Sequence, residues 1–294
     1  MSILRDRLES GAFAVTAEIS PPRGADPGVI RGKVAPLRGL VDAVNITDNQ
    51  SSFVRLSSWA GSLIALTEGV EPVMQVTCRD RNRIALQSDL ISASALGIHN
   101  ITIMTGDHPR HGDHADATPV FDLDSQELLR AARAMRDEHR LLSGREVDPA
   151  PEWFLGAVEN PFGPGAAARL AKKADAGAQF VQTQFVFDVP AFETWMEQVR
   201  DLGLDERCHV IAGVGPIRSA RALEHMSTNL PGVHIPDDIA DRLRGASDIA
   251  EEGVRLCVDL IRRVREIPGV HGVHIMAIGY EHGIPDIVRR AGIR

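Results

Sequence analysis

Short apolar runs that end in polar residues alternate with amphipathic stretches at helical spacing about eight times along the chain. We interpret as strands the runs 13–19, 43–47, 73–78, 100–105, 153–159, 180–186, 209–214 and 270–278. The stretches that favour helices are 27–40, 57–67, 83–96, 125–138, 166–176, 191–202 and 250–264, with a short helix near 236–243. Strands that alternate with helices in this way predict parallel β/α units.

Eight such units predict an α/β protein whose strands close into a (β/α)8 TIM barrel. An open doubly wound sheet would usually carry a Gly-x-Gly-x-x-Gly turn after its first strand, and the segment 19–24 (ISPPRG) does not. We therefore expect residues 1–294 to form a single domain. A loop insertion rich in Gly, His, Asp and Pro is expected at about 106–124, and a second excursion, 139–152, is expected at the opposite rim.

The first predicted strand carries a carboxylate, Glu18, just before it is stopped by Pro21 and Pro22. A buried acid without a partner costs several kcal/mol in order of magnitude. Glu18 therefore needs either a salt bridge at the barrel rim or a chemical function.

Composition narrows the class of protein. The formal net charge of −8 argues against a nucleic-acid or anionic-membrane partner, since both select basic surfaces. The three cysteines form no Cys-x-x-Cys pair, so neither a zinc cage nor a disulfide framework is expected. No apolar run is long enough to span a membrane and the N-terminal stretch does not resemble a signal peptide, so we expect a soluble cytoplasmic protein.

In a barrel, the functional residues lie at the carboxyl ends of the strands and in the loops that follow. Here those positions hold mostly amides and hydroxyls with a few acids, among them Glu18, Thr47, Asp48, Gln75, Thr105, Gly106, Asp107, Glu159, Asn160 and Gln184. Such a lining suits a planar heteroaromatic ligand that is recognised by uncharged groups while one or two acids handle protons. Three histidines, His108, His111 and His114, lie in a Pro/Gly-rich loop without a helix to fix them, so no metal site is expected.

Four segments make the interpretation more specific: 17–22 (AEISPP), 104–107 (MTGD), 172–178 (KKADAGA) and 182–188 (QTQFVFD). In this order and approximate spacing they resemble the catalytic barrel of the methylenetetrahydrofolate reductase family. The resemblance covers nearly the whole chain. It implies reduction of 5,10-methylenetetrahydrofolate to 5-methyltetrahydrofolate by NADH or NADPH through a bound flavin, a step of one-carbon metabolism that serves methionine biosynthesis.

The resemblance also implies roles for three residues near the substrate. Glu18 corresponds to the acid that protonates folate N10, so that the five-membered ring opens to a 5-iminium cation. Asp107 corresponds to the aspartate that binds the pterin and stabilises this cation. Gln184 corresponds to the glutamine that contacts pterin and nicotinamide. The alternatives are a turn residue for Asp107 and a packing residue of the barrel interior for Gln184.

For the cofactor, the resemblance implies that Thr47 lies near the flavin and nicotinamide and Lys173 near the phosphates. The other expected cofactor contacts are Asp48, Gln75, Thr105, Gly106, Asp107, Phe121, Asp122 and Asn160. Lys173 falls on a predicted helix, where it could simply be solvated, and this placement disfavours a Schiff-base aldolase.

Several positions depart from the family pattern. Thr105 stands where many members carry an arginine, Gln75 where they carry a histidine, and Phe121 where they carry a tyrosine. FAD is the expected cofactor, with FMN as an alternative. A second alternative is hydride transfer directly from the nicotinamide without a flavin. A homo-oligomer is expected, and a barrel subunit that receives electrons from a partner protein is the remaining alternative.

Overall fold

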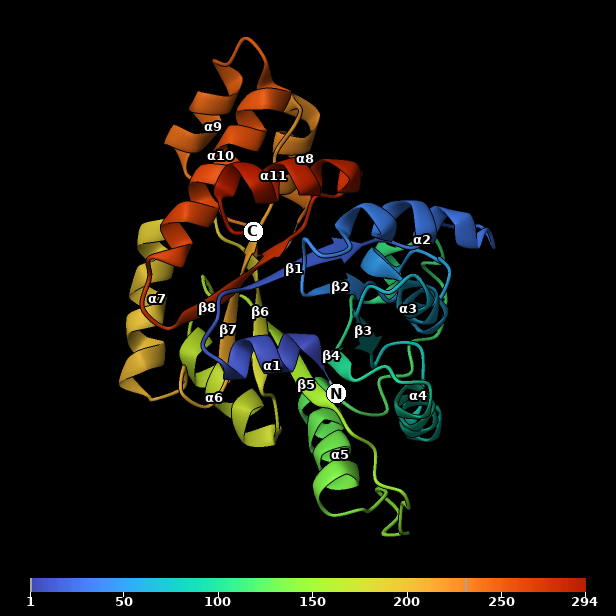
Figure 1. Cartoon of the computed structure of the whole chain (residues 1–294). Coiled ribbons are helices and arrows are strands. Elements are labelled where there is room, and N and C mark those ends of the chain that lie inside the picture. Colours follow the sequence, from blue (N-terminus) through green and yellow to red (C-terminus); the bar gives the residue numbers. More distant parts are fainter. Residues whose placement is uncertain (1, 231) are drawn as a thin grey trace.

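A computed structural model describes residues 2–230 and 232–294. Eight parallel strands close into a barrel in sequential order (Figure 1). Each strand pairs with its neighbours in the chain, and β8 closes the barrel against β1. The strands are β1 (Ala14–Ile19), β2 (Ala43–Ile46), β3 (Pro72–Thr77), β4 (Asn100–Met104), β5 (Phe154–Glu159), β6 (Phe180–Phe185), β7 (His209–Val214) and β8 (Val270–Ile275). The predicted (β/α)8 barrel is therefore confirmed, and all eight strands lie where the apolar runs predicted them.

Helices surround the barrel, and one of them closes the end at which the strands begin. They are α1 (Ile3–Glu9), α2 (Pro27–Val34), α3 (Ser58–Thr67), α4 (Arg83–Ala95), α5 (Ser125–Asp137), α6 (Ala166–Ala176), α7 (Val189–Asp201), α8 (Ala220–Asn229), α9 (Asp237–Arg244), α10 (Ile249–Arg265) and α11 (Ile284–Ala291), with 3-10 turns η1 (Ala35–Leu37), η2 (Gln50–Ser52), η3 (Pro109–His111) and η4 (Glu281–Gly283). In the described part of the chain, no helix is long and apolar enough to cross a membrane.

Two of the helices that follow β1 were missed by the sequence pattern. α8 is largely polar and buries only Leu223 and Met226, so its apolar periodicity is weak. α11 is eight residues long, too short for its pattern to be distinguished from the end of the preceding strand region. In the C-terminal part of the chain, α8 packs against α9 and α11 packs against α10 (Figure 1).

The side chains of each strand alternate between the barrel interior and the surrounding helices. At the amino ends of the strands the interior is apolar: Leu4 and Leu8 of α1 pack there with Ala14, Ala43, Val73, Phe154, Phe180 and Ile211. Phe154 and Phe180 stack with ring centroids 5.0 Å apart. A Cβ atom at Gly156 would lie 2.2 Å from the Phe180 ring, so only glycine fits beneath it. This apolar floor closes the lower end of the barrel.

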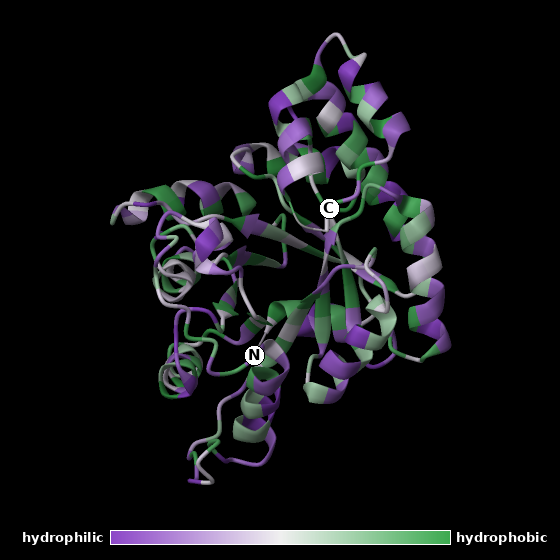
Figure 2. Cartoon of the chain, turned by 180° about the vertical axis from the view of Figure 1, so that it is seen from behind, coloured by the Kyte–Doolittle hydropathy of each residue, from purple (hydrophilic) through white to green (hydrophobic). Residues whose placement is uncertain are grey.

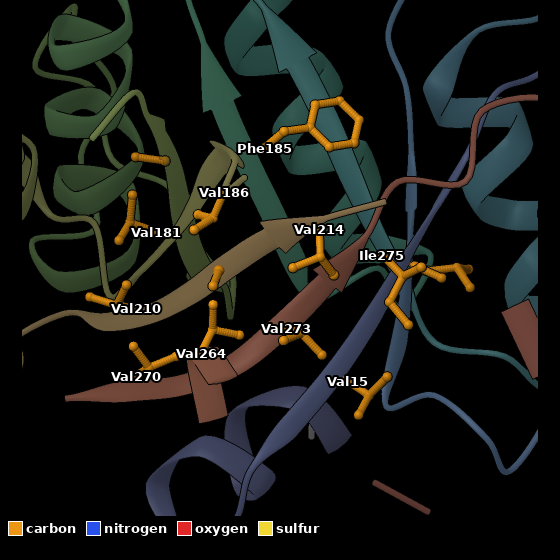
Figure 3. Packing of buried hydrophobic residues seen from close by; sticks show 14 of the residues in the cluster. Val15, Val181, Phe185, Val186, Val210, Val214, Val264, Val270, Val273 and Ile275 are labelled. Atoms are coloured by element: carbon orange, nitrogen blue, oxygen red, sulfur yellow. The ribbon is translucent and has the colours of Figure 1, made fainter. Parts of the chain in front are cut away.

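The outward-facing strand residues form a second core with the helices. Figure 3 shows Val15, Val273 and Ile275 of β1 and β8 pointing away from the barrel interior beside other buried aliphatic side chains. Figure 2 shows the matching pattern on the helices, whose apolar and polar residues lie on different faces. Apolar packing therefore fixes the barrel wall from outside and its floor from within, and the carboxyl ends of the strands remain for polar residues.

The two excursions lie at opposite ends of the barrel. The loop after β4 packs on the loop after β2, where the Ser52 hydroxyl donates to the Asp107 carbonyl at 2.9 Å. A Cβ atom at Gly112 would lie 2.0 Å from the Ser52 carbonyl oxygen, so the two backbones meet at a glycine. The 139–152 excursion contains an antiparallel bridge between Arg140 and Glu146 and joins α5 to the amino end of β5.

Candidate functional site

A cavity of about 520 Å³ opens at the carboxyl ends of the strands. It brings together eleven of the residues expected there from the sequence: Glu18, Thr47, Asp48, Gln75, Thr105, Gly106, Asp107, Glu159, Asn160, Lys173 and Gln184. These residues come from β1 to β6, the loops after them and α6, so they become neighbours only when the barrel closes. The cavity size is within the usual range for a small-molecule site.

Phe121 and Asp122 do not line this cavity. Asp122 accepts hydrogen bonds from Arg83 at the start of α4, from the backbone N–H and from Nε, both at 2.8 Å. Hydrogen bonding from Arg83 lowers the pKa of Asp122 to about 2. The Phe121 ring lies 6.3 Å from the His108 ring, and its backbone has a φ of 39°. In this structure both residues shape the loop before α5, and their contact with a cofactor stays a prediction.

Glu18 points into the cavity from the end of β1, and its side chain is only 10% exposed. Gln50 Nε2 donates to its Oε1 at 3.4 Å, and the Ser20 hydroxyl fixes this amide by donating to Gln50 Oε1 at 2.9 Å. His274 Nε2 lies 3.7 Å from Glu18 Oε2. Among the described residues no lysine or arginine pairs with Glu18, so the rim salt bridge that would make it structural is not present there.

A layer of polar side chains lies beneath Glu18, above the apolar floor. Thr16 Oγ1 and His274 Nδ1 are 2.9 Å apart, and Gln182 Nε2 donates to Thr16 Oγ1 at 3.2 Å. Gln182 and Asn45 also exchange two side-chain hydrogen bonds, of 2.6 and 2.9 Å. Buried polar groups that satisfy one another in this way hold a defined geometry. The layer therefore supports the Glu18 side of the cavity.

Asp107 lies on the far side of the cavity from β1, at the start of the loop after β4. Its carboxylate is exposed and makes no ion pair with a described residue. The preceding Gly106 has a φ of +88°, and a Cβ atom there would lie 2.9 Å from Thr77 Cβ. Glycine is therefore required to turn the chain so that Asp107 faces the cavity.

Arg79, which the sequence analysis did not single out, holds the loops around Asp107. Its side chain is only 2% exposed and forms an ion pair with Asp80 at 2.7 Å. The guanidinium also donates to Asn49 O at 3.3 Å, to Ser52 Oγ at 3.1 Å and to Asp107 O at 3.5 Å. The loop after β2 that it contacts has positive φ values at Asn49, Ser51 and Ser52. Such conformations cost about 1–3 kcal/mol each and persist only where neighbours enforce them.

Two side chains in the first part of the loop after β2 differ in their hydrogen bonding: that of Asp48 is hydrogen-bonded to its neighbours, and that of Thr47 has no partner among the described residues. Asp48 is buried and accepts from the backbone N–H and the hydroxyl of Thr77, each at 2.9 Å, and it forms an ion pair with Arg81. It therefore belongs to the cavity wall. Thr47 Oγ1 is buried without any hydrogen-bond partner in the described chain. A buried hydroxyl without a partner at the edge of a cavity is suited to a ligand group.

Lys173 reaches the cavity from α6. Its Nζ donates to Glu159 Oε2 at 2.6 Å and to Val158 O at 2.5 Å. Glu159 is 1% exposed and also pairs with Arg169 at 2.8 Å. The helix position predicted for Lys173 is thus confirmed. An ammonium bound by a carboxylate is not the neutral amine that a Schiff base requires.

His274 was also missed by the sequence analysis. The alternation of side chains along the last strand could have identified it, because a period of two places His274 on the interior face together with Gly272 and Met276. In the part of the chain that the structure describes, no group of three or more His, Cys, Asp or Glu side chains is arranged to hold a metal ion.

Comparison with known proteins adds to this geometry. The sequence matches the family model described as methylenetetrahydrofolate reductase over residues 3–292. It is 25% identical over 256 residues to a probable methylenetetrahydrofolate reductase (NADPH) of Caenorhabditis elegans, covering 86% of this chain and 36% of that protein. It is 23% identical to the 5,10-methylenetetrahydrofolate reductase of Pectobacterium carotovorum subsp. carotovorum, covering 97% of this chain and 92% of that protein. The chain thus spans little more than a third of the Caenorhabditis relative.

Solved structures show the same fold. A Clostridium thermocellum protein described as binding two copies of 5-methyl-5,6,7,8-tetrahydrofolic acid aligns with a TM-score of 0.71 at 16% identity, over 99% of this chain and 98% of that one. Tryptophan synthase from M. tuberculosis aligns with a TM-score of 0.54 at 13% identity, over the whole of both chains. At these identities the likeness concerns the barrel alone, which hosts many chemistries.

Proposed function

The chain belongs to the methylenetetrahydrofolate reductase family, and we propose that it reduces 5,10-methylenetetrahydrofolate to 5-methyltetrahydrofolate with hydride from NADH or NADPH. The observation that carries the proposal is the common cavity. Glu18, Asp107 and Gln184 lie in three different strand-end regions, and the barrel places all three around one opening. The structural neighbour described as binding a methylated folate is consistent with a folate in such a barrel.

Glu18 is the proposed proton donor. Protonation of folate N10 breaks the bond between N10 and the bridging methylene carbon and leaves an iminium cation at N5. Glu18 suits this role because its neighbours are the Gln50 amide and His274 and not a lysine or arginine, which would hold its carboxylate in an ion pair.

Asp107 is the proposed electrostatic partner of the cation. Its carboxylate is exposed to the cavity and unpaired in the described chain, while Ser52 and Arg79 bind its backbone carbonyl. A charge that is already fixed where positive charge develops lowers the barrier without reorganisation, typically by a few kcal/mol. Hydride then adds to the iminium carbon, which becomes the methyl group.

The family generally uses a flavin, so we tested whether the cavity residues fit one. The unpartnered Thr47 hydroxyl would suit the polar edge of a flavin or nicotinamide ring. The two cations that line the cavity, Arg79 and Lys173, are bound by Asp80 and Glu159. The diphosphate of FAD therefore finds no unpaired cation among the described residues of the lining, and the residues do not fit tightly held FAD.

We therefore favour hydride transfer directly from the nicotinamide nucleotide, which binds for one turnover and need not be retained. The flavin-mediated reaction is the second candidate, because the family generally uses a flavin and the Thr47 hydroxyl suits either ring. The basic loop after β4, which carries His108 and Arg110 in exposed positions, is available to a transiently bound phosphate.

Absorbance spectroscopy and a turnover assay test these statements together. Purified protein without flavin absorbance that still oxidises the nicotinamide only when methylenetetrahydrofolate is present would support direct transfer. Flavin bands that are bleached by the nicotinamide and restored by the folate would establish the flavin-mediated route. Colourless protein that forms no 5-methyltetrahydrofolate with either nucleotide would overturn the proposed activity and favour a partner-dependent subunit.

A further inference from the structure

We propose that His274 is a positioning residue that shares a proton with Glu18 and returns a proton to it in every turnover. The proposal rests on the proposed role of Glu18 as proton donor to the folate. It adds His274 of β8, the strand that pairs with β1, to a site in which Glu18 alone was expected to supply the proton.

The barrel register brings the two residues together. β1 and β8 pair so that Thr16 lies beside His274, which places Glu18 two residues further along the same interior face. The His274 side chain is 3% exposed, and its Nε2 lies 3.7 Å from Glu18 Oε2. This separation is slightly longer than a hydrogen bond, so a small rotation of Glu18 is enough for proton transfer. Both residues line the cavity, where water can reach them before substrate binds.

The other ring nitrogen is bound by a hydroxyl that can serve either protonation state. Thr16 Oγ1 lies 2.9 Å from His274 Nδ1 and 3.4 Å from the Val273 carbonyl. Nδ1 donates to Thr16 Oγ1 both in the protonated imidazole and in the neutral tautomer that remains after Nε2 has given up its proton, and the hydroxyl then turns toward Val273 O.

Gln182 also binds the Thr16 hydroxyl. Its Oε1 accepts from Asn45 Nδ2 at 2.6 Å, and its Nε2 donates to Asn45 Oδ1 at 2.9 Å. In this orientation Gln182 Nε2 donates to Thr16 Oγ1 at 3.2 Å. The Thr16 proton is therefore left for Val273 O when Nδ1 of His274 carries a proton.

Glu18 is the ionisable group that faces His274 directly. From β7, the strand residue paired with His274 is Gly213, and from β6 the Gln182 amide binds the Thr16 hydroxyl beside the imidazole. The other charged groups of the lining lie elsewhere around the cavity: Asp107, and the ion pairs Asp48–Arg81, Arg79–Asp80 and Lys173–Glu159. The protonation of the pair is therefore governed mainly by the two residues themselves.

The proton balance of the proposed cycle is closed. The Glu18 carboxylic acid gives its proton to N10 as the bond from N10 to the methylene carbon breaks. The protonated imidazole then gives its Nε2 proton to Glu18 Oε2 and becomes the neutral tautomer with its proton on Nδ1, which still donates to Thr16, and Nε2 regains a proton from solvent after the product leaves. No electron moves in these steps, because the hydride comes from the nicotinamide.

Substitutions at His274 test the proposal through the pH profile. His274→Gln places an amide near Nε2 but cannot titrate, so we expect kcat to fall about tenfold to a hundredfold with the KM for the nicotinamide nearly unchanged. The alkaline limb of the kcat profile should move to lower pH, since Glu18 then depends on solvent alone for its proton. His282→Gln is the control, because His282 lies on the same side of the barrel but is exposed and outside the cavity lining.

Thr16 provides an independent pair of variants that leaves the histidine in place. Thr16→Val removes the hydroxyl at similar volume and should shift the pH profile in the same direction, whereas Thr16→Ser should restore it. Imidazole added to His274→Ala should also recover part of the lost kcat. An unchanged pH profile in His274→Gln and Thr16→Val, with Glu18→Gln inactive, would overturn the proton sharing and keep the proposed function. Full turnover by Glu18→Gln would overturn the proposed function itself.

Discussion

Two carboxylates with little exposure, Glu18 and Glu159, lie at the carboxyl ends of β1 and β5, and their neighbours give them different roles. Glu159 is held between Lys173 and Arg169, so its charge is compensated within the wall. Glu18 faces an amide and an imidazole, neither of which compensates a carboxylate permanently. A group that exchanges protons must be free to be neutral or charged, and of these two only Glu18 has such surroundings.

Glu18→Gln should therefore abolish reduction of methylenetetrahydrofolate while leaving nucleotide binding intact. We expect a loss of at least about a hundredfold in kcat, because the amide cannot supply the proton that opens the ring. Steady-state turnover and fluorescence titration with the reduced nicotinamide measure the two effects separately. Simultaneous loss of both would indicate that Glu18 supports the structure instead.

Glu159→Gln is the matched change at the other carboxylate. It leaves Lys173 and Arg169 without their anion, so we expect the free energy of unfolding to fall by a few kcal/mol. Chemical denaturation measures this loss. A stability equal to that of the unsubstituted protein would show that solvent, which reaches the partly exposed Arg169, screens the network.

At the level of the elements, the loops after β2, β3 and β4 act as one unit. Arg79, which directly follows β3 and Cys78, binds Asn49 and Ser52 of one loop and Asp107 of the other. The backbone of the β2 loop is strained at Asn49, Ser51 and Ser52, and this same loop carries Gln50 to Glu18. The positions of the proposed proton donor and of Asp107 are thus coupled through one guanidinium.

Arg79→Lys should separate this positioning role from folding. Lysine keeps the charge but cannot reach the Asn49, Ser52 and Asp107 oxygens together, so we expect kcat to fall by about tenfold to a hundredfold. Turnover assays with Arg130→Lys, at an exposed position of α5 outside the cavity lining, as the control measure the effect. Equal activity in the two variants would show that the strained loop is held by other contacts.

At the end of the barrel where the strands begin, the position of α1 depends on a contact with Glu71. Glu71 accepts from the backbone N–H groups of Ile3 and Leu4, at 2.7 and 2.9 Å, and from Asn100 Nδ2 at 2.7 Å. Its negative charge lies at the amino end of α1, where the helix dipole favours an anion. This contact fixes the helix whose Leu4 and Leu8 complete the apolar floor.

Glu71→Gln should lower stability without changing the chemistry. The amide keeps one acceptor but loses the charge, so we expect a loss of about 1–2 kcal/mol in the free energy of unfolding. Urea denaturation measures this, and kcat should be unchanged because α1 closes the end of the barrel opposite the cavity. A fall in kcat would show that the floor and the cavity are coupled.

For the whole molecule, the repeat of strand and helix patterns predicted the barrel and the region of the site. A period of two fixes which strand residues face inward, and parallel strands place their carboxyl ends together. The sequence pattern did not identify Arg79 or His274, because their roles depend on contacts between strands and loops that form only when the barrel closes. Phe121 and Asp122 are assigned to the cofactor by resemblance alone, which stays a prediction, and the ion pair with Arg83 holds the Asp122 side chain against the start of α4.

Barrel closure also brings two histidines together at the end away from the cavity. His209 at the start of β7 and His271 of β8 have ring centroids 4.8 Å apart, and the His209 ring is also near Phe154. Burial, and secondarily the neighbouring His271, lowers the pKa of His209 to about 4. Burial likewise lowers the pKa of His271, and His271 Nδ1 accepts from the Val210 N–H at 3.2 Å. The fold therefore favours both imidazoles in the neutral form.

The sign of the resulting pH dependence follows from proton binding. In the unfolded chain a histidine titrates near pH 6.5, so between about pH 6.5 and 4 the unfolded state binds more protons than the folded state. Stability is fully present above this window and is lost as the pH falls through it. We expect a loss on the order of 1 kcal/mol in the free energy of unfolding by about pH 5, since both rings are partly exposed.

His209→Gln should reduce the dependence of the thermal midpoint on pH in this range. Because these histidines lie at the far end of the barrel, the variant should keep the pH profile of kcat unchanged, and a shifted kcat profile would contradict this separation of the two ends.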